Sequence, residues 1–109
     1  ARNAMRLRYE GSTSIKDIIP DLRPYVNQGM HFRIDVLWAD AATGYMRTYM
    51  KLPGQTAYTL VDEKTNYRTF AGNVSVGNLG YIKWGAYVTQ EGLTRIVYHD
   101  DIRIIKLPL

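Results

Sequence analysis

The sequence predicts an all-β protein built as an antiparallel β-sandwich. Two observations predict this class: apolar and polar residues alternate with the two-residue period of strands, and short turns rich in Gly, Pro, Asn and Asp separate the alternating stretches. No stretch shows the periodicity of a long helix. With 109 residues, the chain has the length of one domain with a modest core, so we expect residues 1–109 to form a single β-sandwich unit.

The first predicted elements are short. Apolar and polar residues alternate over 5–9, which predicts a strand. The Gly-Ser-Thr-Ser run at 11–14 ends this strand. Residues 15–19 fit either a helical turn or a short edge strand, and Pro20 stops them. The Pro, Asn and Gly residues between positions 20 and 29 indicate a connecting segment.

The clearest predicted strand covers residues 31–39. We expect its alternate apolar residues to face inward: Phe32, Ile34, Val36 and Trp38. Residues 40–44 have the length and terminal Gly of a hairpin loop, and residues 45–52 form the return strand, which ends at a Pro53-Gly54 turn. A hairpin is therefore the central prediction for the fold.

The remaining sequence predicts further strands. Residues 56–61 form a short strand, the polar run 62–66 a loop, and residues 67–76 a less regular strand. Residues 81–88 alternate again. Residues 95–107 close the chain as a long strand that bends at Asp100-Asp101.

The stretch 81–87 also carries the most unusual surface. As a strand, it points Tyr81, Lys83 and Tyr87 to one face, while Gly85 leaves open space between them. A Tyr beside a cation can transfer a proton. The same rings can stack on a sugar while their hydroxyl groups remain available for hydrogen bonds. The residues alone leave catalysis and binding both open.

A second strand carries a similar pattern, because Tyr45, Arg47, Tyr49 and Lys51 share one face of residues 45–52. If both strands lie in one sheet with these faces on the same side, they form a positively charged surface that carries tyrosine rings. Nine Tyr and a net charge of +4 favour a ligand-binding face and an anionic partner. The alternative is an ordinary solvated face of an antiparallel sheet.

Other site classes find less support. The absence of Cys excludes disulfides and thiolate metal sites. His31 has no second ligand at metal spacing, and His99-Asp100-Asp101 fits a bulge or turn better, so we assign no metal and no cofactor. No apolar run approaches the ~18 residues of a membrane span. A small nucleic-acid-binding β-domain is disfavoured because the chain has no RNA-binding signature and no dense Lys/Arg segment.

Three stretches resemble one family. The 81–87 stretch, Tyr-Ile-Lys-Trp-Gly-Ala-Tyr, is similar to the Tyr-Phe-Lys-x-Gly-x-Tyr signature of jelly-roll, concanavalin-like polysaccharide lyases of the alginate, glucuronan and heparin lyase type. Residues 31–38 with 43–45 resemble a hairpin of these sandwiches, and residues 97–104 resemble their final strand. The resemblance spans about residues 5–107. The chain departs from the alginate-lyase form at Thr89, where that form has Gln.

The resemblance implies β-elimination on a uronate-containing glycan. Tyr87 would take the C5 proton, protonate the departing glycosidic oxygen, or do both. Lys83 would support the substrate carboxylate or hold Tyr87, and Tyr81 would line the groove. The second strand, with Tyr45, Arg47, Tyr49 and Lys51, would supply further groove lining.

A complete jelly-roll lyase needs ~200 residues, so the resemblance implies the C-terminal half of a larger lyase domain. The expected partners are an acidic polysaccharide and the missing half of the sandwich, as a second chain or segment. Polymer substrates and the sequon at Asn73 favour a secreted protein. The alternative function is a non-catalytic, carbohydrate-binding or lectin-like module that uses the same face.

Overall fold

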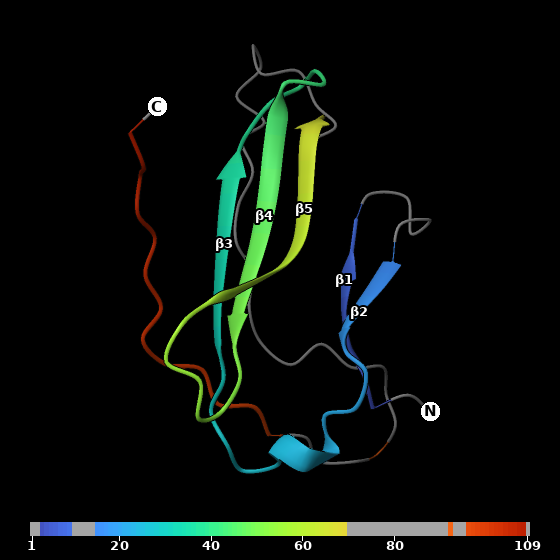
Figure 1. The fold of residues 1–109 in the computed structure, drawn as a ribbon, viewed down its shortest axis with the longest axis vertical. Coiled ribbons are helices and arrows are strands. Elements are labelled where there is room, and N and C mark those ends of the chain that lie inside the picture. Colours follow the sequence, from blue (N-terminus) through green and yellow to red (C-terminus); the bar gives the residue numbers. More distant parts are fainter. Residues whose placement is uncertain (1–2, 10–14, 70–91, 93–95, 109) are drawn as a thin grey trace. The chain divides into compact units, whose positions relative to one another are not determined.

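A computed structural model describes residues 3–9, 15–69, 92 and 96–108. The chain divides into two units, Ala1–Leu79 and Gly80–Leu109. The described part of the first unit contains five strands in two antiparallel sheets and one short 3-10 helix (Figure 1). The prediction of an all-β fold with antiparallel pairing is confirmed for this part of the chain.

The smaller sheet pairs β1 (Met5–Arg8) with β2 (Ile15–Ile19). Residues 15–19 are therefore a strand and not a helical turn. Arg6 and Asp17 are opposite each other in the register, and their side chains form an ion pair at 2.7 Å. The 3-10 helix η2 (Arg23–Tyr25) follows in the predicted connecting segment.

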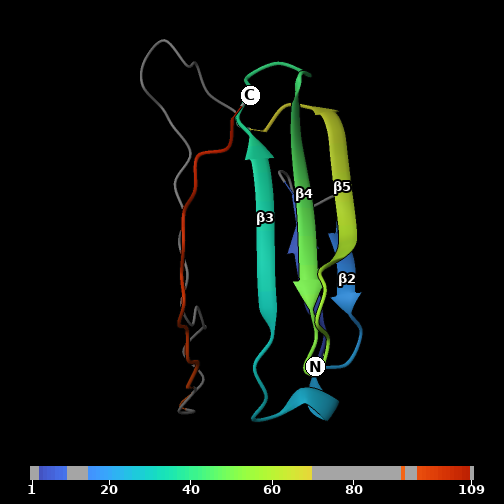
Figure 2. The same ribbon diagram turned by 60° about the vertical axis from the view of Figure 1, so that its left-hand side comes forward.

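The larger sheet has the order β3-β4-β5, with β3 (His31–Leu37), β4 (Gly44–Lys51) and β5 (Thr59–Tyr67) (Figure 2). The predicted hairpin of β3 and β4 is confirmed, with His31 opposite Lys51 and Leu37 opposite Tyr45. The Pro53-Gly54 turn is confirmed as well. Gly54 has φ of +86°, and the Gln55 amide donates to the Leu52 carbonyl at 3.0 Å.

The predicted loop at 62–66 is wrong, because these residues belong to β5. The pairing of β4 with β5 shifts register twice, between Thr48 and Tyr49 and between Gly44 and Met46. Each shift inserts an extra residue into β5, and Asn66 takes a left-handed φ of +49° at the second. Alternation is lost at both places, so the strand does not read as one in the sequence.

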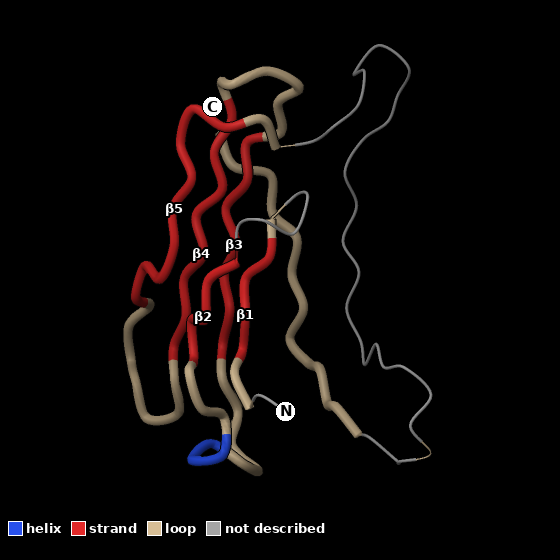
Figure 3. The backbone as a smooth tube through the Cα atoms, turned by 90° about the vertical axis from the view of Figure 1, so that its right-hand side faces the viewer, coloured by secondary structure: helices blue, strands red, loops and turns tan. Residues whose placement is uncertain are grey.

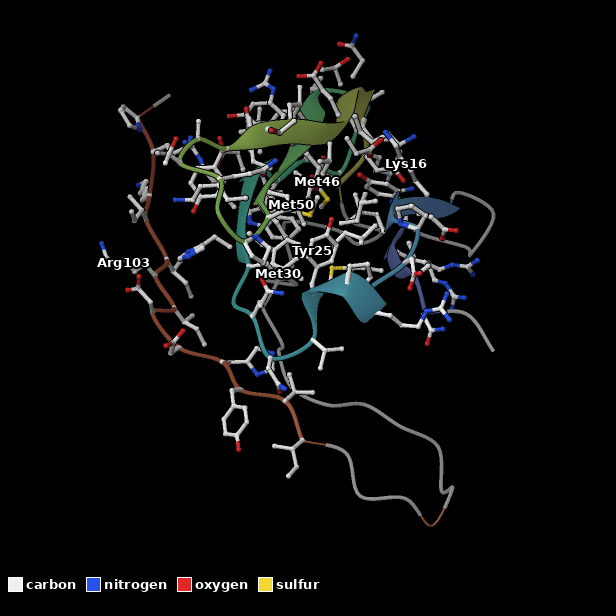
Figure 4. The ribbon with its side chains drawn as sticks, turned by 60° about the horizontal axis from the view of Figure 1, so that its bottom comes forward. Lys16, Tyr25, Met30, Met46, Met50 and Arg103 are labelled. Atoms are coloured by element: carbon white, nitrogen blue, oxygen red, sulfur yellow. The ribbon has the colours of Figure 1, made fainter. Side chains whose placement is uncertain are left out.

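The core lies on one face of the larger sheet. Thr48 and Met50 are buried there, together with Tyr9 after β1 and Ile19 of β2. Tyr9 contacts β5, so the hairpin of β1 and β2 lies against this face (Figure 3). Figure 4 shows Met46 and Met50 on the same side of the sheet.

The expectation that Phe32, Ile34, Val36 and Trp38 are buried is wrong for three of these residues. Phe32, Ile34 and Trp38 are exposed at 41%, 55% and 45%. The β1–β2 hairpin contacts β5, which is one edge strand of the larger sheet. β3 is the other edge strand. The hairpin therefore covers one side of the core face and leaves the β3 side accessible.

Residues 96–108, in the second unit, form no strand, so the predicted closing strand is wrong for these residues. Extended backbone becomes a strand only when a neighbouring strand pairs with it, and Asp101 interrupts the extension with a left-handed φ of +50°. Several large apolar side chains of the segment are exposed: Ile96, Val97, Tyr98, Ile102, Ile104, Ile105 and Leu107. Within the described residues, no helix has the length and apolar character needed to cross a membrane.

Candidate functional site

The four residues of β4 that were predicted to share a face lie on the side of the larger sheet opposite the core. Tyr45, Arg47, Tyr49 and Lys51 alternate with the buried Thr48 and Met50, and the register adds neighbours from β3 and β5. We call this surface the outer face. Its residues are His31, Arg33, Asp35, Leu37, Tyr45, Arg47, Tyr49, Lys51, Tyr58, Leu60 and Glu63.

Cations lie over Tyr rings at three places on the outer face. The Arg47 guanidinium carbon lies 4.2 Å from the centroid of the Tyr45 ring, and that of Arg33 lies 5.2 Å from the Tyr49 ring. The Lys51 ammonium lies 4.7 Å from the centroid of the Tyr58 ring. Each contact holds a flexible cation against a rigid ring, so the face presents ordered charges and phenols.

Carboxylates neutralise the two arginines of the outer face. Arg47 pairs with Glu63 at 2.7 Å, and Arg33 pairs with Asp35 at 2.8 Å. These hydrogen bonds raise the pKa of both guanidinium groups. The outer face therefore carries both positive and negative charges, whereas the residues of β4 alone predicted a surface with positive charges only. Glu63 was missed because its position opposite Arg47 depends on the bulge in β5.

A second cluster lies on the core face, where the β1–β2 hairpin meets β5. The Tyr9 phenol donates a hydrogen bond to the Asp62 carboxylate, and the Lys16 ammonium donates to the other oxygen of that carboxylate at 3.3 Å. Lys16 also donates to the Val61 carbonyl at 2.6 Å. The Tyr9 ring meets the Tyr67 ring edge-on at 6.0 Å. We call these five residues the Tyr9–Asp62 cluster.

The electrostatics of the Tyr9–Asp62 cluster favour a neutral phenol and an ionised carboxylate. Burial, together with the hydrogen bond to Asp62, raises the pKa of Tyr9 well above its ordinary range. Burial alone would raise the pKa of Asp62, but the hydrogen bonds from Tyr9 and Lys16 outweigh it and lower that pKa. A phenol held neutral this firmly is a poor base at neutral pH. The cluster is therefore a structural cross-link between the two sheets.

Three predicted site residues, Tyr81, Lys83 and Tyr87, lie outside the described residues. The described residues do show that the other four, on β4, share one face. Within the described ranges, no three His, Cys, Asp or Glu side chains gather in a way that could hold a metal ion. His31 is exposed at the start of β3.

Comparisons with models of protein families, with curated proteins and with solved structures find no significant match to this chain.

Proposed function

We propose that this chain is part of a polysaccharide lyase that cleaves a uronate-containing glycan by β-elimination. In this proposal, the two antiparallel sheets belong to a concanavalin-like jelly-roll sandwich, and the protein is secreted to reach its polymeric substrate. The sequence motif at 81–87 suggests the reaction, and the outer face supports binding of the substrate.

The observation that carries the proposal is the row of phenols and cations on β4. Tyr45, Arg47, Tyr49 and Lys51 lie side by side along one strand of the outer face. Tyr rings contact the apolar faces of sugar rings, while phenol and guanidinium groups donate hydrogen bonds to hydroxyl and carboxylate groups. A linear glycan lying along β4 would meet such groups at every second residue.

The proposed reaction assigns Tyr87 as the acid and base. Tyr87 removes the C5 proton of the uronate, a C4–C5 double bond forms, and the bond from C4 to the glycosidic oxygen breaks. A proton returns to the departing oxygen. Lys83 stabilises the negative charge that develops on the substrate carboxylate and favours the ionised phenol, and Tyr81 lines the groove.

The test is the ultraviolet absorbance of the unsaturated product when the protein is mixed with alginate, glucuronan or heparin. We expect an increase for the wild type and none for Tyr87→Phe, since the variant keeps the ring and loses the proton-transferring hydroxyl. Tyr98→Phe is the matched control, because Tyr98 is 90% exposed, and it should retain the activity. An increase that persists in Tyr87→Phe would refute the assignment of Tyr87.

The second candidate function is a non-catalytic, carbohydrate-binding module that uses the outer face. The observation that favours it is the kind of group on this face: tyrosine rings with cations over them, and two arginines paired with carboxylates, are suited to contact with a sugar. Binding of an acidic glycan without any unsaturated product would establish this function in place of the lyase.

The proposal includes a further partner for the core face. The exposed Phe32, Ile34 and Trp38 support the proposal that the missing half of the sandwich, as a second chain or segment, covers this side. Addition of that half should then protect these side chains from solvent and raise the stability of the larger sheet.

A further inference from the structure

The outer face is not electrostatically uniform along β4. Near the middle of the strand, Arg47 pairs with Glu63, and Arg33 of the neighbouring strand pairs with Asp35. The strand ends at Lys51, where the described residues place no carboxylate within ion-pair distance of the ammonium. Among the described residues, carboxylates thus neutralise the two arginines, and the charge of Lys51 is not neutralised.

Three groups that can donate hydrogen bonds gather at the Lys51 end. His31, the first residue of β3, is directly opposite Lys51 in the register, which puts the two side chains on the same face within reach of one ligand. The Lys51 ammonium lies 4.7 Å from the centroid of the Tyr58 ring. Since the ring takes up one side of the ammonium, the remaining N–H groups are directed elsewhere.

The turn between β4 and β5 holds this arrangement in place. The Leu52 amide donates to the Gln55 side-chain oxygen at 2.9 Å, and the Gln55 amide donates back to the Leu52 carbonyl at 3.0 Å. With Gly54 in its left-handed conformation, the chain reverses and returns Tyr58 to the side of Lys51. Lys51 and Tyr58 therefore lie on either side of a turn held by hydrogen bonds, and His31 is held in β3 opposite Lys51.

We infer that the carboxylate of an acidic sugar binds at the Lys51 end of the outer face, on Lys51, His31 and Tyr58, and not on the arginines. The inference rests on the proposed function, because it specifies how the glycan lies on that face. A carboxylate at Arg47 or Arg33 would be repelled by the Glu63 or Asp35 carboxylate already paired there, whereas at Lys51 it meets no carboxylate of the described residues. The arginines and their tyrosines then contact uncharged parts of the sugar.

The experiment measures the affinity of the full chain for an oligoglucuronate by titration calorimetry, with a neutral glucan oligomer of equal length as the control ligand. Lys51→Met should weaken binding of the oligoglucuronate by about fivefold to tenfold, the effect of losing one charge-assisted contact at a solvated site. Lys51→Arg should retain most of the affinity. Arg47→Met should weaken binding less than Lys51→Met.

The outcomes separate the inference from the function on which it rests. An Arg47→Met variant that loses as much affinity as Lys51→Met, or more, would overturn the inference and leave the proposed function standing. A wild-type chain that binds neither the oligoglucuronate nor alginate, glucuronan or heparin would overturn both. An NMR titration of the wild type needs no variant: shifts that concentrate at residues 31, 51 and 58 support the inference, and shifts that concentrate at residues 45 and 47 refute it.

Discussion

Tyr9 and Asp62, 53 residues apart in sequence, are joined by a hydrogen bond from the phenol to the carboxylate. The bond links the end of the smaller sheet to β5 of the larger one. Tyr9 is 9% exposed, so water competes weakly for either partner. We therefore expect this pair to contribute strongly to the stability of the first unit.

Tyr9→Phe tests the contribution of the bond. The substitution keeps the ring and removes the donor, which leaves a carboxylate oxygen of Asp62 without one of its partners. We expect the free energy of unfolding to fall by about 1–2 kcal/mol, measured by urea denaturation. Tyr58→Phe is the matched control on an exposed ring and should change stability by less than about 0.5 kcal/mol. Equal effects for the two variants would contradict this role of Tyr9.

The lowered pKa of Asp62 predicts a loss of stability in acid. Because the folded pKa lies below the ordinary value of 3.8, the folded state binds fewer protons than the unfolded state at that pH. The stabilisation is therefore complete above this value and is lost as the pH falls through the folded pKa. Asp62→Asn should be less stable at neutral pH and should lose less stability on acidification. An acid transition with the same slope in both proteins would exclude Asp62 as its source.

The raised pKa of Tyr9 predicts a second loss in alkali. The unfolded phenol ionises near its ordinary value of 10.0, while the folded phenol stays protonated. Stability is complete below that value and falls as the pH rises toward the folded pKa. Stability measured up to strongly alkaline pH should fall less steeply for Tyr9→Phe than for the wild type. No difference between the two slopes would argue against a buried, neutral phenol.

Thr48→Val removes a buried hydroxyl that has no hydrogen-bond partner among the described residues. Thr48 is 1% exposed in the middle of β4, and its Oγ1 has no hydrogen-bond partner among the described residues. Since Val has a similar shape and favours strands, we expect unchanged stability or a gain of up to about 1 kcal/mol, measured by thermal unfolding. A loss of more than about 1 kcal/mol would show that the hydroxyl is bonded in solution.

Gly44→Ala should disturb the end of the hairpin. A Cβ at Gly44 would lie 2.6 Å from the Leu37 carbonyl oxygen and 2.7 Å from that of Tyr67, and both are backbone atoms that cannot turn away. We expect a loss of about 2 kcal/mol or more, by analogy with overpacked cores. Gly29→Ala is the control, because nothing lies within 4 Å of its Cβ position, and it should be neutral. Similar losses in both variants would refute the close approach.

Much of the larger sheet was predictable from local pattern. The β3–β4 hairpin alternates regularly, and Pro53-Gly54 has the residues that its turn requires, so period and turn chemistry agree. Only the start of β5 was predictable, as residues 59–61 of the predicted strand 56–61, since the two bulges break the alternation in the rest. Residues 96–108 show the opposite case: their sequence alternates, yet the structure assigns them no strand.

The candidate site was predictable only within one strand. The alternation of Tyr45, Arg47, Tyr49 and Lys51 fixes a shared face. The partners of that face depend on register, which a single strand does not encode. Glu63 reaches Arg47, and Asp62 reaches Tyr9, only because a bulge accommodates the extra residue that precedes them in β5. The compensation of Arg47 by Glu63 therefore becomes visible only in three dimensions.

The two bulges of β5 allow this strand to lose a residue without changing the faces of the others. Thr59, Asp62, Lys64 and Tyr67 are paired with β4 residues of the core face, although their spacings are three, two and three. Deleting Val61 would remove the first bulge and leave Thr59, Leu60, Asp62 and Glu63 alternating regularly opposite the same β4 residues as before. Asp62 would stay on the core face and Glu63 on the outer face, so the loss of this residue preserves both ionic contacts. Natural variants of this strand should therefore differ in length at the bulges while the residues between them keep their faces.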